Sequence, residues 1–336
     1  MNQAEKLLEI KDLCVEFKTM AGTVRAVDHL SYSLRKGEKL GIVGESGSGK
    51  SVSSLAMMQL IPNPPGKVTG GQILYNGKDL VQLSEREMQK IRGNEISMIF
   101  QEPMTSLNPI IRCGKQIAES LKLHRGMKKK EAMEEAIRMM EAVGIANPSM
   151  RAYEYPHQMS GGMRQRVMIA MALACQPQIL IADEPTTALD VTIQAQILDL
   201  IRDLNQTMNT SVVFITHDLG VVSELCDTVM VMYNGRMVEK APAQEIFESP
   251  LHPYTQGLLN AIPRITKERA PLSTIEGMVP NPTERIEGCR FWPRCPKATE
   301  QCKKQEPPVF EVSDSRQVRC WLCDPNETTG GDGNGN

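Results

Sequence analysis

The sequence predicts an α/β fold with a mostly parallel sheet, some antiparallel structure and a small, irregular, cysteine-containing C-terminal appendage. Short apolar runs alternate with helical patterns through the first 240 residues, and prolines recur after about residue 240 while helical periodicity fades. Apolar runs too short for a helix and bounded by charged or turn residues are typical of buried strands. Strand and helix in alternation imply a parallel sheet covered on both faces.

Five apolar runs are predicted as buried strands: 40–43, 96–100, 179–182, 212–216 and 229–233. Apolar residues at helical spacing predict helices within 133–143 and 193–204. Asn76-Gly77 and Asn234-Gly235 each follow an apolar strand, where this pair favours a tight hairpin turn. We therefore expect antiparallel structure in the fold, including within the first thirty-odd residues.

Length and charge narrow the class of protein. A chain of 336 residues suits one large domain, or one of about 250 residues with a smaller appendage. Lys and Arg number 38 against 40 Asp and Glu, so the net charge of −2 shows no footprint of a nucleic-acid binder. The N-terminal residues have no signal-peptide pattern, and no apolar run reaches the ~18 residues of a spanning helix. We expect a cytosolic protein without nucleic-acid partners.

The stretch GIVGESGSGKS, residues 41–51, carries the clearest chemistry. An apolar strand, a glycine-rich loop and a helix follow one another in the order that a P-loop requires. The glycines let successive N–H groups face one phosphate, Lys50 reaches the outer phosphates, and Ser51 ligates Mg²⁺. The alternative is a glycine-rich turn with a chance Lys-Ser. The predicted nucleotide-binding residues here are Gly44, Glu45, Ser46, Gly47, Ser48, Gly49, Lys50, Ser51 and Val52.

A second strand supplies the acids that a nucleoside triphosphate site needs. In ILIADEP, Asp183 and Glu184 follow four apolar residues. Asp183 is predicted to hold Mg²⁺ through water, and Glu184 to polarise the attacking water as general base. Two acids after a strand also occur as helix N-caps, which is the structural alternative.

Together with the P-loop, the stretches SGGMRQR (160–166), IADEPTTALD (181–190) and ITHD (215–218) resemble the ATP-binding cassette family. The resemblance covers roughly residues 7–240 and implies a P-loop NTPase core with a helical signature subdomain at about 105–165. With the change of composition after residue 240, we predict a nucleotide-binding domain over 1–240 and an appendage over 241–323. The Gly-, Asn- and Thr-rich end predicts a disordered tail over 324–336.

The resemblance also assigns single residues. Ser160, Gly161 and Gly162 resemble the signature loop that binds the γ-phosphate of an ATP held by another subunit. Asp190 resembles the residue of the loop that crosses the interface between the two cassettes, and His217 the switch histidine near the γ-phosphate.

Two more nucleotide contacts follow from the resemblance. Gln101 resembles the glutamine that ligates Mg²⁺ and senses the membrane partner, so Ser51, Gln101 and Asp183 are the expected Mg²⁺ residues. Phe17 is similar in position to the aromatic that stacks on adenine. An aromatic near a strand end is commonly a core residue, and a single Gln or His there is commonly an ordinary polar residue.

Within the family, MIFQEPMTSLNP and HPYTQGLLNAIP resemble the oligopeptide and dipeptide importer branch. This implies an ATPase on the cytoplasmic face of the membrane, peripheral and without a spanning segment. Its implied partners are a second ATPase subunit, more commonly a different one than a copy of itself, two membrane-spanning permeases and, indirectly, an extracellular peptide-binding protein. The alternatives are another importer substrate such as nickel, or a soluble ATPase that transports nothing.

Five of the nine cysteines lie near the C-terminal end: Cys289, Cys295, Cys302, Cys320 and Cys323. A reducing cytosol argues against disulfides. Zinc usually takes close Cys-x₂₋₄-Cys pairs, and of these five cysteines only Cys320 and Cys323 form one. GCRFWPRCPKATEQC resembles the segment of peptide-importer ATPases that carries a [4Fe-4S] cluster. The resemblance implies Cys289, Cys295, Cys302 and Cys320 as its ligands and leaves Cys323 spare; zinc is the alternative.

Overall fold

The computed structural model describes residues 6–101, 106–186, 191–262, 275–280, 283–284 and 286–325. The chain divides into two compact units. The first contains residues 1–8, 34–39 and 75–215, and the second contains residues 9–33, 40–74 and 216–336. The predicted tail beyond residue 325 and Asp190 lie outside the described residues.

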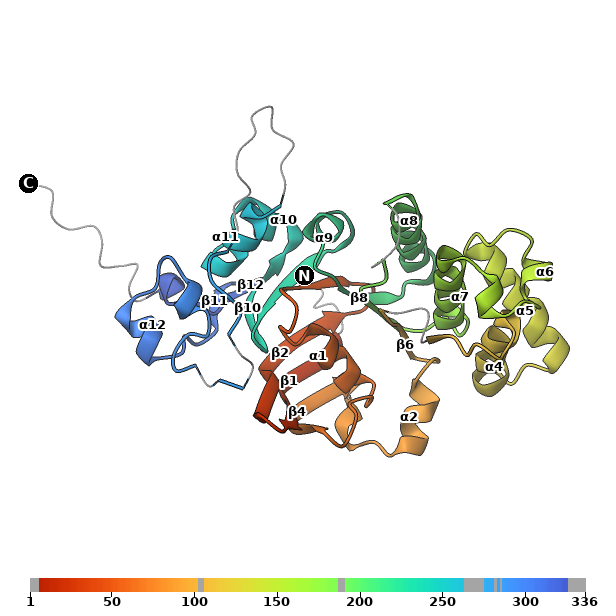
Figure 1. The fold of residues 1–336 in the computed structure, drawn as a ribbon, viewed down its shortest axis with the longest axis horizontal. Helices are drawn as coiled ribbons and strands as arrows, with labels where there is room; N and C mark the ends of the chain where they lie inside the picture. Colours follow the sequence, from red (N-terminus) through yellow and green to blue (C-terminus); the bar gives the residue numbers. More distant parts are fainter. Residues whose placement is uncertain are drawn as a thin grey trace, which may run out of the picture. The chain divides into compact units, whose positions relative to one another are not determined.

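The first unit contains a run of parallel strands with helices (Figure 1). Strand β7 (Ile179–Asp183) pairs in parallel with β6 (Ile96–Ile99) on one side and β8 (Ser211–Ile215) on the other. All residues of these three strands are buried, as apolar runs without alternation predict. Helix α8 (Val191–Met208) connects β7 to β8, and β5 (Lys78–Asp79), η1 (Leu80–Gln82) and α2 (Glu85–Ile91) precede β6.

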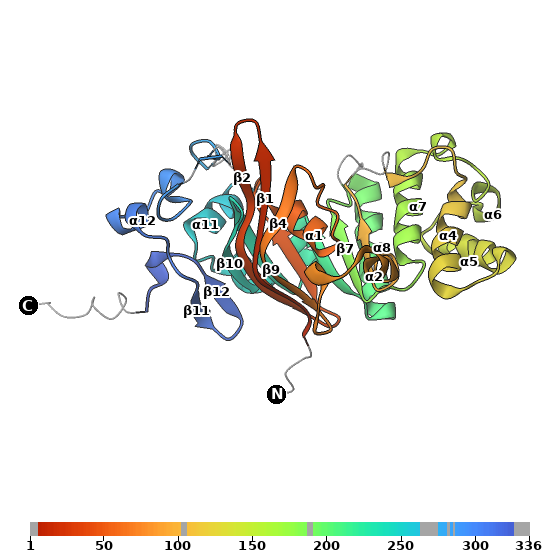
Figure 2. The ribbon, with the colours of Figure 1, turned by 90° about the horizontal axis from the view of Figure 1, so that it is seen from below.

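Helices gather at one end of the first unit, where Figures 1 and 2 show α4, α5, α6 and α7 together. They are α4 (Cys113–Arg125), α5 (Lys129–Ala142), α6 (Pro148–Arg151) and α7 (Gly161–Leu173), with the short η2 (Pro156–Gln158) before α7. Helices α4 and α5 each contact α7. Their buried residues repeat at helical spacing, as Ala132, Ala136, Met139 and Met140 do in α5.

The second unit contains most of the long strands formed by the first 35 residues of the chain. Strands β1 (Lys6–Thr19) and β2 (Gly22–Arg35) are neighbours joined by two residues, so they run antiparallel, and β4 (Gly66–Tyr75) lies on the other side of β1 (Figure 2). Strand β3 (Lys39–Val43) leads into helix α1 (Lys50–Met57). The expected antiparallel structure in the first thirty-odd residues is confirmed.

Strand β3 pairs in parallel with β9 (Thr228–Tyr233), which follows α9 (Leu219–Leu225). Strand β10 (Arg236–Pro242) pairs antiparallel with β9 through the predicted Asn-Gly turn, where Asn234 has φ 43° and Gly235 φ 82°. All five predicted strands are therefore present, within one residue of the predicted bounds at each end.

The C-terminal part has more regular structure than the sequence suggested. Helices α10 (Ala243–Glu248), α11 (Pro253–Asn260) and α12 (Glu300–Lys304) occur there, with the turns η3 (Trp292–Arg294) and η4 (Trp321–Cys323). Strands β11 (Phe310–Ser313) and β12 (Arg316–Val318) form a hairpin, and β12 pairs with β10. These elements have three to eight residues each, which is too short for periodicity to reveal.

Candidate functional site

The P-loop spans the turn between β3 and α1 in the second unit. Gly44, Gly47 and Gly49 have φ of 154°, 78° and 97°, in the region that favours glycine. A Cβ on Gly44 would lie 2.2 Å from the Met232 carbonyl oxygen, and one on Gly49 would lie 2.2 Å from that of Ala26. Only glycine therefore fits at these two positions, which keeps the loop tight enough for its N–H groups to converge.

Lys50 is the first residue of helix α1 and is 6% exposed. Its Nζ donates to the carbonyl oxygens of Gly44 at 2.7 Å and Glu45 at 2.9 Å, and to Ser48 Oγ at 3.3 Å. The ammonium group thus lies against the loop that precedes it. A phosphate group in the loop would meet both this charge and the positive end of the helix.

The two acids lie in the first unit, where β7 ends. Asp183 is its last residue and is 5% exposed. Glu184 has φ 45°, a conformation uncommon for a residue other than glycine, and its N–H donates to the Ile215 carbonyl at 2.9 Å. Gln101 Nε2 donates to Glu184 Oε2 at 3.0 Å. The structure therefore brings Gln101 and Glu184 together, although they are far apart in sequence.

Ser160 begins helix α7, also in the first unit. Its Oγ accepts a hydrogen bond from the Met163 N–H at 3.3 Å, so it is the N-cap of a 13-residue helix. Ser160 and Gly161 are exposed, and a Cβ on Gly161 would meet nothing within 4 Å. The N-terminal end of α7 is therefore open to an anionic ligand from outside the chain.

Sequence reasoning missed Gln165 on the same helix. It is 2% exposed, and its Nε2 donates to the Pro185 carbonyl at 2.6 Å. Pro185 directly follows Glu184, so this bond joins the helix that Ser160 begins to the segment that carries the acid. Gln165 lies between Arg164 and Arg166 in the sequence, so no local pattern marks it as buried.

The remaining predicted nucleotide residues lie in the second unit. His217 is exposed and lies between Thr216, whose N–H donates to the Ile42 carbonyl at 3.3 Å, and Asp218, which caps α9. Phe17 on β1 is partly exposed, and its ring lies beside Gly66, where a Cβ would come within 2.6 Å of it. The Cδ1–Cε1 edge of the ring therefore lies close to Gly66, the first residue of strand β4.

Four cysteines line one small cavity of the second unit: Cys289, Cys295, Cys302 and Cys320. The other lining residues include Phe291, Trp292 and Trp321. Burial raises the pKa of Cys289 to about 11 and that of Cys320 to about 12, and it also raises the pKa of Cys295. At neutral pH these thiols are protonated unless a cation replaces the protons. The predicted spare, Cys323, does not line this cavity.

The distances between the donor atoms of these cysteines bear on whether they could hold a single zinc ion. Tetrahedral zinc with Zn–S bonds of ~2.3 Å holds its sulfurs roughly 3.8 Å apart. Among the described residues, the group of three potential ligands with all donor atoms within 4.8 Å is Cys14, Asp28 and His29, and it includes none of the four. Asp28 in that group is bonded to two arginines, Arg236 and Arg290, which compete with a metal ion for its carboxylate.

Comparison with known proteins defines the class. Residues 27–187 match the family model of the ABC transporter, and residues 238–302 match that of the oligopeptide/dipeptide transporter C-terminal region. The dimeric ATP-binding cassette MJ0796, solved in a post-hydrolysis state with ADP and Pi, superposes with a TM-score of 0.64. The two sequences are 28% identical, and the match covers 70% of this chain and 98% of the MJ0796 chain. The chain is an ATP-binding cassette ATPase.

Its branch is also defined. The oligopeptide transport ATP-binding protein OppD of Bacillus subtilis is 53% identical over 327 residues, which cover 97% of this chain and 91% of OppD. The dipeptide transport ATP-binding protein DppD of Escherichia coli is 51% identical over 314 residues, or 94% and 96% of the two chains. This chain belongs to the ABC transporter family, in the branch of these peptide-transport ATP-binding proteins. In the described part of the chain, no helix has the length and apolarity to cross a membrane.

Proposed function

We propose that the chain is the ATP-hydrolysing subunit of an importer for oligopeptides or dipeptides. The observation that carries this is the match over most of the chain to relatives named for peptide transport, together with the match of residues 238–302 to the oligopeptide/dipeptide transporter C-terminal region. The alternatives of a nickel importer or a non-transporting ATPase have no comparable support among these matches.

We assign the predicted site residues the following roles in ATP binding and hydrolysis. Lys50 and the P-loop N–H groups bind the phosphates, Ser51, Gln101 and Asp183 hold Mg²⁺, and Glu184 polarises the attacking water. Mg²⁺ supplies neutralisation of the charge that develops on the phosphate oxygens. The hydrogen bond from Gln101 to Glu184 supports this assignment because it orients the proposed base. We further assign Phe17 to adenine stacking and His217 to the γ-phosphate.

A second ATPase subunit would complete the site. The exposed N-terminal end of α7 supports a role for Ser160, Gly161 and Gly162 toward an ATP that another subunit holds. Asp190 would lie at the same interface. Because a ligand shifts an equilibrium only through differential affinity, ATP favours the closed pair by contacts that exist only when the two subunits meet. Hydrolysis removes those contacts, and the pair opens.

The cysteine cavity is proposed to hold a [4Fe-4S] cluster through Cys289, Cys295, Cys302 and Cys320, with zinc as the alternative. Four thiols around one cavity supply the donors that such a cluster takes, and a cluster holds its ligands further apart than a single zinc ion does. A bound cluster would take the four side chains as thiolates and cross-link the segments that carry them. Iron and sulfide analysis of anaerobically purified Cys289→Ser and Cys323→Ser variants tests this, with loss expected only in the first.

The proposed location is the cytoplasmic face of a membrane, with two spanning permease subunits, a second cassette that is more commonly a different chain, and an extracellular binding protein. We propose the division into a nucleotide-binding domain over 1–240, an appendage over 241–323 and a tail over 324–336. Purification of the tagged full-length chain from membranes tests the assembly, with spanning subunits and a second cassette expected.

Uptake by the assembled importer tests the substrate class. Labelled di- and pentapeptides should be taken up in an ATP-dependent manner, and nickel should not. Uptake of nickel without peptide uptake would contradict the proposed substrate, and co-purification of ribosomes or nucleic acid in place of spanning subunits would contradict transport itself.

A further inference from the structure

Arg294 of the C-terminal region forms a two-pronged ion pair with Glu45 of the P-loop. Its Nη1 lies 2.7 Å from Glu45 Oε2 and its Nη2 lies 3.1 Å from Glu45 Oε1. The Arg294 side chain is 4% exposed, and that of Glu45 is 29% exposed. The hydrogen bonds to Glu45 raise the pKa of Arg294, so the guanidinium is charged throughout the physiological range. A shielded fork-to-fork pair is among the stronger and more directional contacts in proteins.

Tyr254 on α11 holds the same P-loop residue from another side. Its hydroxyl accepts the Glu45 N–H at 2.9 Å, and the side chain is fully buried. Its ring packs on Tyr233, with centroids 4.7 Å apart, and on Phe291, at 5.3 Å. Since Lys50 Nζ donates to the Glu45 carbonyl, the N–H, the side chain and the carbonyl of Glu45 are all bonded.

Arg294 is itself fixed by its surroundings. Its Nε donates to the Glu276 carbonyl at 3.1 Å, and its guanidinium lies over the Tyr233 ring, 5.9 Å from the centroid. It ends the turn η3, directly before Cys295, whose N–H donates to the Trp292 carbonyl at 3.2 Å. The position of this arginine therefore depends on the segment between Cys289 and Cys295.

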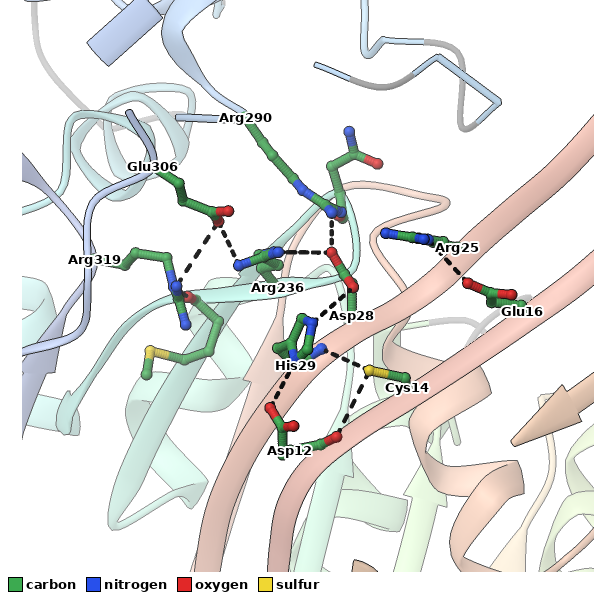
Figure 3. A network of polar contacts seen from close by, with 12 residues as sticks. Asp12, Cys14, Glu16, Arg25, Asp28, His29, Arg236, Arg290, Glu306 and Arg319 are labelled. Carbon is green, nitrogen blue, oxygen red and sulfur yellow. Dashed lines mark hydrogen bonds and ion pairs between the residues drawn. The ribbon is translucent and has the colours of Figure 1, made fainter. Parts of the chain in front are cut away.

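A second arginine anchors that segment at its other end. Arg290, next to Cys289, forms an ion pair with the buried Asp28 on β2 and donates to the Asn234 carbonyl. Figure 3 shows this pair inside a wider network in which Arg236 bonds to both Asp28 and Glu306. Burial disfavours the Asp28 carboxylate, but Arg290 and Arg236 outweigh it and lower its pKa. The segment is thus fastened to strand β2 at one end and to the P-loop at the other.

From this geometry we propose that Arg294 and Tyr254 are positioning residues for the P-loop, through which the C-terminal region sets the affinity of the chain for ATP. The proposal rests on the proposed nucleotide site. A loop that is already ordered loses less entropy when it binds a ligand, so the clamp on Glu45 favours nucleotide binding. A merely structural arginine would stabilise the C-terminal region without any effect on the P-loop.

The test is the dissociation constant of a fluorescent ATP analogue, methylanthraniloyl-ATP, measured on the full-length chain. Arg294→Gln and Glu45→Gln should each weaken binding by about tenfold, which corresponds to roughly 1.4 kcal/mol. The double variant should be no weaker than either single one, because the two residues act as one contact. Arg294→Lys should recover part of the lost affinity, since lysine keeps the positive charge but cannot form the two parallel hydrogen bonds to Glu45.

Two further variants make the result decisive. Arg319→Gln is the control, because it removes another partly buried arginine of the C-terminal region. Arg319 bonds to Glu306 and to the carbonyls of Met237 and Pro307, and to no P-loop residue. It should lower the melting temperature as Arg294→Gln does but leave the dissociation constant unchanged. Equal affinity of Arg294→Gln and Arg319→Gln, or additive effects of Arg294→Gln and Glu45→Gln, would overturn the proposal. Undiminished binding by Lys50→Ala would overturn the nucleotide site beneath it.

Discussion

The amide of Gln101 donates a hydrogen bond to the carboxylate of Glu184 at 3.0 Å, which joins two segments 83 residues apart in the chain. Glu184 also has a left-handed backbone conformation, with φ 45°. A strained backbone and a fixed carboxylate together are typical of a group that must be held in one orientation. This geometry supports the role of Glu184 as general base and leads to the first prediction.

Replacement of Glu184 by Gln should lower ATP turnover by about 10²- to 10⁴-fold, because the amide cannot accept a proton from the attacking water. Binding of ATP should persist, since the substitution keeps the shape of the side chain. Single-turnover hydrolysis and equilibrium binding on the same preparation measure the two effects. Near-normal hydrolysis by this variant would remove Glu184 from the proposed role.

Replacement of Lys50 by Ala should weaken nucleotide binding by about ten- to a hundredfold, as expected for loss of a hydrogen bond to a charged group. The ammonium group is nearly buried against the P-loop and donates to the Gly44 carbonyl, so its loss removes a positive charge held at the loop. Titration with ATP measures the effect. Lys130→Ala is the control, because the Lys130 side chain on α5 is 92% exposed. Equal affinities of the two variants would argue against the phosphate cradle.

Alanine substitutions at Gly49 and Gly126 distinguish a steric clash from backbone strain. Gly49 and Gly126 have φ of 97° and 66°, but a Cβ would lie 2.2 Å from the Ala26 carbonyl oxygen at Gly49 and would meet nothing within 4 Å at Gly126. Gly126→Ala should cost about 1–2 kcal/mol of unfolding free energy through strain alone. Gly49→Ala should in addition displace the P-loop and weaken ATP binding. Chemical denaturation and ATP titration distinguish the two, and wild-type affinity in Gly49→Ala would contradict the steric argument.

Ser160 and Ser84 are both N-cap residues, of helices α7 and α2. Replacement of either by Ala should cost about 0.5–2 kcal/mol of unfolding free energy. Only Ser160→Ala should lower the ATP turnover of the assembled importer, because only Ser160 is proposed to contact the ATP of the other subunit. If both variants lose turnover in proportion to their stability, Ser160 acts as a cap and nothing more.

Stability should fall in mild acid because of His252. Burial lowers its pKa to about 3, and its Nδ1 accepts the Tyr254 N–H at 3.0 Å. Below pH 6.5 the unfolded chain binds a proton at this residue that the folded chain does not, so the free energy of unfolding decreases as the pH falls from 6.5 toward 3. The loss should reach about 2 kcal/mol at pH 5.

His252→Asn is the control for this pH dependence, since Asn is a favourable N-cap that accepts the same N–H without titrating. Urea unfolding at pH 7, 6 and 5 should give a smaller decrease for this variant than for the natural chain. Parallel decreases in the two proteins would assign the acid sensitivity to other groups.

The sequence alone predicts the parts of the site that are local in the chain. A strand, a glycine-rich loop and a helix lie within 20 residues, so the P-loop is visible in the order of Gly44, Lys50 and Ser51. The bounds of β7 and the two acids at its end, Asp183 and Glu184, are visible for the same reason. Gln101 and Ser160 were found through resemblance to a family, because neither has a local pattern that distinguishes it from an ordinary polar residue.

The contacts that the sequence did not reveal join distant segments. Arg294 and Glu45 are 249 residues apart, and Glu45 and Tyr254 are 209 apart. No periodicity links such positions, and an arginine between two cysteines looks like an ordinary surface residue. The elements of the C-terminal region were also missed, since a helix of five or six residues depends on tertiary packing more than on its own pattern.

The separation between Glu45 and Arg294 has a consequence for biogenesis. A ribosome that adds about 5–20 residues per second completes the P-loop roughly 10 to 50 s before it adds the arginine that clamps the loop. A nascent chain released after residue 218 but before Arg294 would contain every nucleotide motif but an unclamped P-loop. On this proposal, the P-loop becomes competent to bind ATP tightly only after the ribosome has added the C-terminal region that contains Arg294.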